Sequence, residues 1–289
     1  ANTHDNVKFK PTPDFNNDGY QEYAIVGIHK VNKTRQLVVK DGATKRQYQV
    51  FKWVDNWESP RIVFMDDVTG DSVSEVALYG HHKRLNKGQL FALDGQTGAK
   101  LNVYNWNKLW SKNTLHKMSD IDGDGTADWG QFGERLDDGR YQWVVKKGSD
   151  SKGVIRTFSW PADLTNTNPL LLKDRTGDGV KEVAIYGVND KGNVILRIND
   201  GKLSNTRIAN FSWPNLWQHQ SVIELGDLNK DGFNEVALLG TNKRSNATQL
   251  IIKNGNDASE YGRLSFSTTS HKVEIKSFDV NEDGYADIA

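Results

Sequence analysis

Short apolar runs recur along the whole chain, separated by polar turns rich in Gly, Asn and Asp. In the first unit these runs predict four strands, at residues 7–10, 22–28, 36–40 and 46–53. The second strand is an almost continuous apolar run, which is typical of a strand buried on both faces. Asp41-Gly42 predicts a hairpin after the third strand. At Arg61 the same unit begins again, and no helical periodicity interrupts the pattern.

Four strands in every fifty or so residues are typical of one blade of a β-propeller. We predict an all-β fold, a β-propeller of four-stranded antiparallel blades with five complete repeats and a partial sixth. The chain is expected to form a single domain over residues 1–289, with repeats that start near residues 7, 61, 113, 169, 221 and 271.

The sixth repeat reaches only its second strand, where the sequence given ends at Ala289. Half a blade leaves the edges of its sheet unpaired. We therefore expect a segment of a longer protein with six or seven blades, the alternative being a last blade completed in some other way.

An Asp-rich loop is predicted between the first and second strands of every repeat. Its six copies begin at Asp14, Asp67, Asp120, Asp174, Asp227 and Asp279, in steps of 52 to 54 residues. Counted from that Asp, oxygen-bearing residues stand at positions 1, 3, 5 and 9, while position 6 is Gly in most copies and position 7 can offer its carbonyl. This pattern can supply the six to eight oxygens that Ca²⁺ prefers.

We number the loops 1 to 6 in chain order. Their predicted ligands are Asp14, Asn16, Asp18, Tyr20 and Glu22; Asp67, Thr69, Asp71, Val73 and Glu75; Asp120, Asp122, Asp124, Thr126 and Asp128; Asp174, Thr176, Asp178, Val180 and Glu182; Asp227, Asn229, Asp231, Phe233 and Glu235; and Asp279, Asn281, Asp283, Tyr285 and Asp287. Loop 3 has four carboxylates and is expected to bind calcium most tightly. Loop 2, with Thr69 and with Ser72 in place of Gly, is expected to be weakest or empty. The alternative is that the loops are metal-free Asx-turns.

The motif Asp-x-Asn-x-Asp-Gly-x-x-Glu-Val-Ala-x-x-Gly, present at residues 227–240, resembles the FG-GAP/VCBS repeat family. The resemblance extends over nearly the whole chain and implies a calcium-binding propeller like that of integrin α subunits. The family includes adhesion modules, lectin-like domains and propellers of polysaccharide lyases. Because the FG and GAP tripeptides are not clearly present, the resemblance does not imply an integrin-type partner.

Composition narrows the function. The 37 basic residues balance 37 acidic ones, so the net charge gives no general attraction to nucleic acid or a membrane surface. The absence of Cys excludes disulfides and thiol chemistry. No apolar run is long enough to insert in a membrane. Calcium loops that fill at about 10⁻⁴–10⁻³ M favour a secreted, extracellular or cell-surface location.

The face opposite the calcium loops is expected to collect aromatic and basic residues. Trp53, Trp106, Trp160 and Trp213 are expected to pack between blades. The candidate ligand-binding residues are Trp57, Trp110, Trp217, His81, His82, Arg84, Arg35 and Arg244. Aromatic rings beside cations suit acidic sugars, so we expect an anionic polysaccharide as the partner, with a cell-surface protein as the alternative.

Sequence motifs do not favour catalysis. The chain has no Gly-x-Ser-x-Gly, no zinc-type His spacing and no phosphate-binding loop. One alternative to a binding or adhesion module is the propeller of a polysaccharide lyase, with His81, His82, Arg84 and Tyr79 near the reaction. The other is a protein-interaction or structural module of a larger surface protein. The enzyme question stays open at this point, with a binding module favoured.

Overall fold

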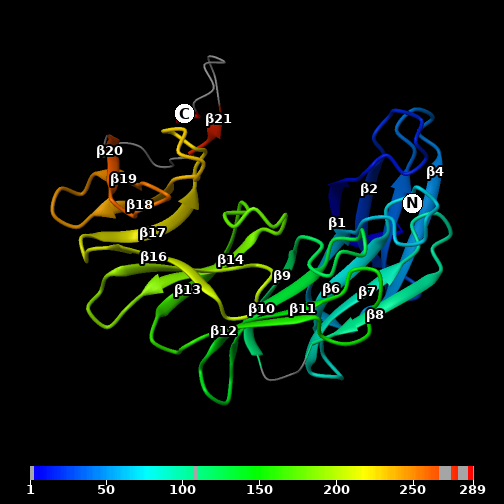
Figure 1. The fold of residues 1–289 in the computed structure, drawn as a ribbon. Coiled ribbons are helices and arrows are strands. Elements are labelled where there is room, and N and C mark those ends of the chain that lie inside the picture. The colour runs from blue at the N-terminus through cyan, green and yellow to red at the C-terminus, as the bar shows by residue number, and fades with distance from the viewer. Residues whose placement is uncertain (1–2, 107–109, 267–274, 279–285, 289) are drawn as a thin grey trace. The chain divides into compact units, whose positions relative to one another are not determined.

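The computed structural model describes residues 3–106, 110–266, 275–278 and 286–288, and this part of the chain contains only strands and turns. It forms five four-stranded sheets, each with its strands in chain order (Figure 1). The first sheet consists of β1 (His4–Pro11), β2 (Tyr23–His29), β3 (Thr34–Lys40) and β4 (Gln47–Val54), and the second of β5 (Trp57–Phe64), β6 (Val76–His82), β7 (Lys87–Leu93) and β8 (Lys100–Asn105).

The remaining sheets repeat this plan. They consist of β9 (Trp110–Lys117), β10 (Trp129–Arg135), β11 (Tyr141–Lys146) and β12 (Arg156–Trp160); β13 (Thr165–Leu172), β14 (Glu182–Val188), β15 (Val194–Asn199) and β16 (Arg207–Trp213); and β17 (Trp217–Glu224), β18 (Val236–Asn242), β19 (Thr248–Lys253) and β20 (Glu260–Phe266). A two-stranded sheet of β21 (Ser277–Phe278) and β22 (Asp287–Ile288) follows. The predicted five complete repeats and partial sixth are confirmed.

The chain divides into two compact units, Ala1–Thr157 and Phe158–Ala289, with the boundary inside β12. Each unit is described by itself below, and the single domain expected over residues 1–289 stays a prediction. Among the described residues, no helix has the length and apolar character that crossing a membrane requires.

The hydrophobic core of each unit lies between consecutive sheets. In the first unit, Leu37 and Phe51 of the first sheet belong to one buried cluster with Leu78 of the second. In the second unit, Phe211 of the fourth sheet shares a cluster with Leu238 of the fifth. The second strands of the second, third and fourth sheets are buried along most of their length, as their apolar runs predict. The prediction made for residues 22–28 is met only in part, because β2 is mostly half-buried.

Tryptophan side chains from the ends of the fourth strands link neighbouring sheets. The indole Nε1 of Trp106 donates to the Val144 carbonyl at 2.8 Å, and Trp53 and Trp213 make the equivalent bonds to carbonyls of the next sheet. All three side chains are buried, as is Trp160, whose Nε1 has no hydrogen-bond partner within the described structure. The predicted packing between blades is confirmed for Trp53, Trp106 and Trp213, whereas for Trp160 the structure shows burial alone.

The first strands share a local irregularity. In β1, β5, β13 and β17 the pairing with the second strand shifts by a bulge. A residue of each bulge has a positive φ: 53° for Asn6, 45° for Ser59, and 51° for both Asn166 and His219. Such bulges bend a strand and redirect its side chains. In these four sheets the first strand is therefore bent at the same place in the repeat.

We predict that Trp106→Phe lowers the free energy of unfolding by about 1–3 kcal/mol, because a buried hydrogen bond and part of a packed ring are lost. Urea denaturation followed by circular dichroism would measure this. Trp160→Phe is the matched control: it makes the same change at the equivalent position without removing a hydrogen bond. Its loss should be smaller, and equal losses would show that the inter-sheet bond contributes nothing.

Candidate functional site

The backbone of the Asp-rich loops is held by the first Asp of each loop. Its carboxylate accepts the N–H of position 6 at 2.7–2.9 Å in all five described loops. Position 6 has a positive φ throughout, including 68° for Ser72 of loop 2. Gly adopts this conformation freely while Ser does not, so loop 2 keeps the shared shape with backbone strain. In loop 6 the residues 279–285 and the Asp287 side chain lie outside the described part of the chain.

The carboxylate at position 9 connects each loop to the core. It is at most 1% exposed in loops 1 to 5, and one of its oxygens accepts the N–H of loop position 2. The five residues are Glu22, Glu75, Asp128, Glu182 and Glu235. A buried carboxylate needs such partners, because removal from water costs it far more than a neutral side chain.

In loops 2, 3 and 4 the second oxygen of this carboxylate is also satisfied by the backbone. It accepts the N–H of a Gly in the turn after the third strand: Gly95 for Glu75, Gly148 for Asp128 and Gly201 for Glu182, at 2.8–2.9 Å. These carboxylates therefore have a structural role that needs no metal.

The role of those glycines was not predicted, although Asp41-Gly42 was read as a turn. A Cβ on Gly201 would lie 1.9 Å from the Lys181 carbonyl oxygen, and Gly42, Gly95, Gly148 and Gly255 make equally close approaches. Only Gly fits, since no other residue lacks a Cβ. The recurrence of Gly 19 or 20 residues after position 9 was the signal in the sequence.

In loops 1 and 5 the carboxylate at position 9 keeps one oxygen without a partner. Glu22 Oε1 and Glu235 Oε1 are buried and make no hydrogen bond, and Asp14 Oδ1 in loop 1 is in the same state. Oxygens of Asp14, Asp18 and Glu22 lie within 4.8 Å of one another, as do oxygens of Asp227, Asp231 and Glu235. An all-oxygen set of this kind suits a hard divalent cation.

No described Lys or Arg forms an ion pair with either of these two groups of carboxylates. Burial raises the pKa of Glu22, and the nearby Asp14 and Asp18 add to the rise. Burial likewise raises the pKa of Glu235, with repulsion from Asp227 and Asp231 acting in the same direction. In both clusters a bound cation would favour the charged form of the carboxylates and offset their mutual repulsion.

Loop 3 differs from this arrangement. Asp120, Asp122 and Asp124 also come within 4.8 Å of one another. However, the Lys147 ammonium lies 3.0 Å from carboxylate oxygens of both Asp122 and Asp124. The Ser149 hydroxyl, then Lys147, lowers the pKa of Asp124, whereas burial raises the pKa of Asp128 to about 6. A lysine from the neighbouring turn thus already neutralises part of the cluster.

Loops 2 and 4 gather fewer oxygens. Burial alone would raise the pKa of Asp67, but the N–H groups of Gly70 and Ser72 that donate to it lower the pKa overall. The pKa of Asp174 is lowered in the same way, by Gly179 and Gly177. In both loops position 3 is a Thr, and its hydroxyl donates a hydrogen bond to the carboxylate of the first Asp.

Arg175 is an exception at loop position 2, where Phe15, Ile121 and Leu228 are buried apolar residues. Its guanidinium extends from loop 4 to loop 5, donates to the carbonyls of Asn234 and Gly255, and lies 5.6 Å from the Phe233 ring centroid. Arg175 therefore fastens two consecutive loops of the second unit through carbonyl groups rather than through the carboxylates of loop 5.

The three tryptophans predicted to bind a ligand are strand residues. Trp57, Trp110 and Trp217 are the first residues of β5, β9 and β17. Trp57 and Trp217 are only 5% and 3% exposed, and Trp217 Nε1 donates to Gln249 at 3.1 Å. Because the strands begin at these residues, the two rings pack into the core and offer no free face to a sugar.

Some predicted residues do come together. Trp110 and His81 line a cavity of about 360 Å³ between the second and third sheets, with Glu58, Tyr79 and Asn113. His82 contacts the edge of Trp57 beside a separate cavity of about 460 Å³. Arg84 and Arg244 are exposed on turns, and neither lines these cavities. Arg35 lies in β3 and pairs with Asp55 at 2.9 Å.

Comparisons with known proteins identify the fold. No family model matches the chain, and a search of the curated proteins finds no match. A solved structure of the Dos1 propeller is similar to 88% of this chain over 58% of its own, with a TM-score of 0.50 and 12% identity. A crystal structure of the eukaryotic initiation factor is similar to 90% of this chain over 55% of its own, with a TM-score of 0.52 and 9% identity.

The chain thus spans somewhat more than half the length of these chains, and at such identities the likeness shows the fold alone. Together with the five sheets of sequentially ordered antiparallel strands, it establishes the fold class. The protein is a β-propeller with four-stranded blades, and its Asp-rich loops join the first and second strands of each blade.

We predict that Glu182→Gln lowers the free energy of unfolding by about 1–3 kcal/mol in buffer containing a chelator, because the amide NH₂ group would face a backbone N–H. Thermal and urea denaturation at pH 8 would measure the loss. Glu235→Gln is the matched control, since its free oxygen can become the NH₂ group without opposing a donor. A loss at Glu235 as large as that at Glu182 would contradict the two arrangements described.

Proposed function

We propose that the protein is a calcium-stabilised β-propeller of the FG-GAP/VCBS type that acts outside the cell as a binding or adhesion module. The single observation that supports calcium most strongly is the set of buried, unpartnered carboxylate oxygens in loops 1 and 5. Leaving such atoms without a partner is costly, and a cation enclosed by the loop would satisfy them.

The order of affinity that we propose differs from the order expected from carboxylate number. Loops 1 and 5 come first, since Glu22 and Glu235 each have an oxygen to give. Loop 3 comes after them, because Asp128 has both oxygens bonded to the backbone and Lys147 neutralises Asp122 and Asp124. Loops 2 and 4 are weakest, with Thr at position 3 and a fully bonded Glu at position 9.

The role proposed for calcium is to stabilise the hairpin between the first two strands of a blade. Bound only by the folded chain, the ion raises the free energy of unfolding by mass action. The residues that would hold it are Asp14, Asn16, Asp18 and Glu22 in loop 1, and their counterparts Asp227, Asn229, Asp231 and Glu235 in loop 5. Affinities usual for extracellular calcium modules fit a secreted or cell-surface protein.

The ligand that we propose is an anionic carbohydrate. Support comes from a cavity of the first unit whose lining includes the aromatic residue Phe9 and the cationic residues Lys8, Lys10 and Arg35. Aromatic and cationic side chains together favour sugars that carry a carboxylate or sulfate. A cell-surface protein as ligand is the alternative that binding experiments would reveal.

Calcium is predicted to raise the melting temperature, and chelator to lower it. One site saturated at 100 times its dissociation constant adds on the order of 3 kcal/mol. Differential scanning calorimetry of the wild type, Glu22→Gln, Glu235→Gln and the double variant should show the calcium-dependent part shrinking with each substitution. Asp128→Asn is the matched control in loop 3 and should leave most of that part intact.

A melting temperature that is the same with calcium and with chelator would mean that the loops are metal-free turns. A calcium response carried by Asp128 rather than by Glu22 and Glu235 would restore the order expected from carboxylate number.

Native electrophoresis through gels that contain anionic polysaccharides tests the ligand class. We expect at least one such polymer to retard the protein in calcium, and a neutral polysaccharide to leave its mobility unchanged. Loss of retardation with chelator would link ligand binding to the calcium-stabilised fold. No retardation by any acidic polymer would argue against a glycan and in favour of a protein partner.

A further inference from the structure

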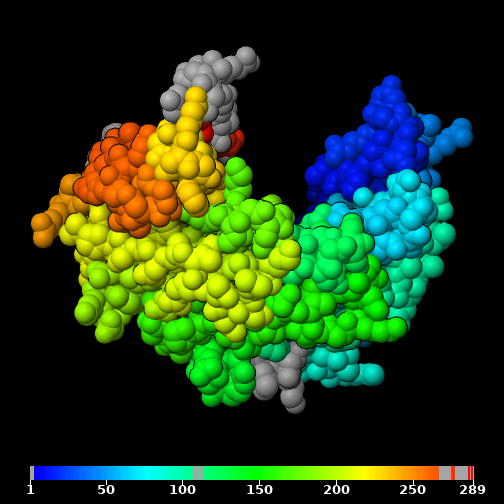
Figure 2. Space-filling view, viewed as in Figure 1, coloured from blue at the N-terminus to red at the C-terminus, as the bar shows by residue number. Residues whose placement is uncertain are grey.

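A cavity of about 670 Å³ lies between the first and second sheets, both in the first unit. It is lined by residues 6–10 of β1 and 59–62 of β5, with Val26, Arg35 and Leu78. In the space-filling view the atoms of the first sheet, in blue, border those of the second sheet, in cyan (Figure 2). The bulges at Asn6 and Ser59 are part of its wall. Its volume suits a ligand the size of one or two sugar rings.

Cavities also lie at the equivalent position between other neighbouring sheets. The cavity of about 360 Å³ between the second and third sheets includes Gly88, the counterpart of Arg35, and the bulge residue Ser59. In the second unit, a cavity of about 280 Å³ includes Val194, also a counterpart of Arg35, and the bulge residues Asn166 and His219. The bulge thus creates a cavity at each of these blade pairs, and their linings can be compared.

Only the first of these three cavities has a cationic wall. Lys8 pairs with Val26, and Val26 with Leu37, so Lys8, Lys10 and Arg35 alternate onto the same face of the first sheet. That face is turned to the second sheet, because the Lys10 ammonium lies 5.4 Å from the ring centroid of Phe64. The lining residues include no Asp or Glu.

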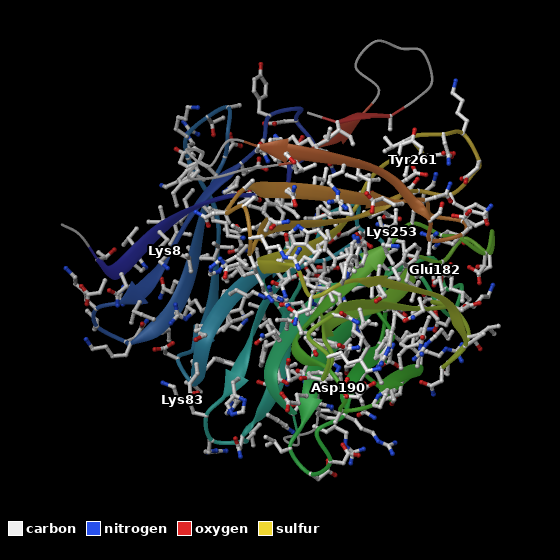
Figure 3. All side chains as sticks on the ribbon, turned by 90° about the vertical axis from the view of Figure 1, so that its left-hand side faces the viewer. Lys8, Lys83, Glu182, Asp190, Lys253 and Tyr261 are labelled. Atoms are coloured by element: carbon white, nitrogen blue, oxygen red, sulfur yellow. The ribbon has the colours of Figure 1, made fainter. Side chains whose placement is uncertain are left out.

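The positive charge of this wall is only partly compensated. Arg35 donates through Nε and Nη2 to a single oxygen of Asp55, which leaves Nη1 outside that pair. Within the described structure, Lys8 and Lys10 form no ion pair. Figure 3 shows Lys8 on the ribbon of β1, well apart from Lys83 in the turn between β6 and β7.

Arg61 is the counterpart of Lys8 in the second sheet, and its cationic group has partners within the protein. The Arg61 guanidinium donates to the Leu115 carbonyl and lies 5.2 Å from the Tyr79 ring centroid. Arg61 also lines the first cavity, but these contacts satisfy its charge within the protein. Lys8 has no such partner among the described residues, so its ammonium remains available to a ligand.

The opposite wall of the cavity, formed by the second sheet, contains both apolar and polar residues. Pro60 is half-buried and offers apolar surface on which a pyranose ring can lie, whereas Ile62 and Leu78 are buried in the core. Asn6 and Ser59 supply hydrogen-bonding groups for hydroxyls. An apolar wall that faces three cations is a combination that favours an acidic sugar over a small inorganic anion.

We propose that this cavity is the site that binds an acidic sugar unit, with its carboxylate or sulfate at Lys8, Lys10 and Arg35. The proposal rests on the proposed function and names its site, whereas the sequence predicts a site made of aromatic and basic residues on the face opposite the calcium loops. Arg35 was among the candidates expected from the sequence, whereas Lys8 and Lys10 were not.

The test is isothermal titration calorimetry with a uronic acid disaccharide, a sulfated disaccharide and the neutral disaccharide maltose. We expect the wild type to bind one or both acidic probes and not maltose. Lys8→Met with Lys10→Met keeps the apolar stems but removes both charges. It should weaken binding at least about tenfold, as loss of charge-assisted hydrogen bonds does.

Two controls separate the possible outcomes. Lys152→Ala removes an exposed lysine that does not line the cavity and should leave affinity and melting temperature unchanged. Lys83→Ala with Arg84→Ala removes the basic turn and should have little effect. The two probes distinguish a carboxylate from a sulfate as the recognised group.

If the basic-turn variant loses binding while Lys8→Met/Lys10→Met binds like the wild type, the cavity is not the site, although the proposed glycan-binding function stands. If the wild type binds neither acidic probe, the cavity proposal is overturned; the polysaccharide gels then decide the ligand class independently.

Discussion

The structure depends on one repeated interaction, the hydrogen bond from the N–H of loop position 2 to the buried carboxylate at position 9. It is present in all five described loops and joins the end of a first strand to the start of a second. A buried carboxylate without partners would be unstable, so each loop must provide further bonds around it. The close approach of Gly95, Gly148 and Gly201 provides them in three blades.

This constraint explains why similar loops have different roles. Where the Gly N–H reaches the carboxylate, the loop is complete without an ion. Where it does not, as at Glu22 and Glu235, an oxygen is left for a cation. Loop 3 has the Gly148 bond and, in addition, Lys147 beside Asp122 and Asp124 contributes positive charge. A count of carboxylates therefore does not give the order of calcium affinity, because the second partner of position 9 matters more.

Much of the fold could be predicted from the sequence, and the reasons are local. Apolar runs such as Glu182–Val188 and a repeat of 52 to 54 residues are enough to define strands and blades. The Asp-rich loops could be found because the turn requires the same residue types at the same loop positions in every copy. The sequence did not reveal that Trp57 and Trp217 are buried. Their burial follows from their place as the first residues of β5 and β17, and the apolar pattern does not fix the residue at which a strand begins. Lys147 and Lys8 were missed for a related reason: their importance comes from contacts across a turn or between blades.

The unpartnered oxygens of loops 1 and 5 are the centre of this account, and a crystal structure of the calcium-loaded protein tests them most directly. The account predicts an ion held by Asp14, Asp18 and Glu22, and another held by Asp227, Asp231 and Glu235. It also predicts that Glu75 and Glu182 keep both of their backbone bonds. Ions in loops 2 and 4 with loops 1 and 5 empty, or no ion in any loop, would contradict it.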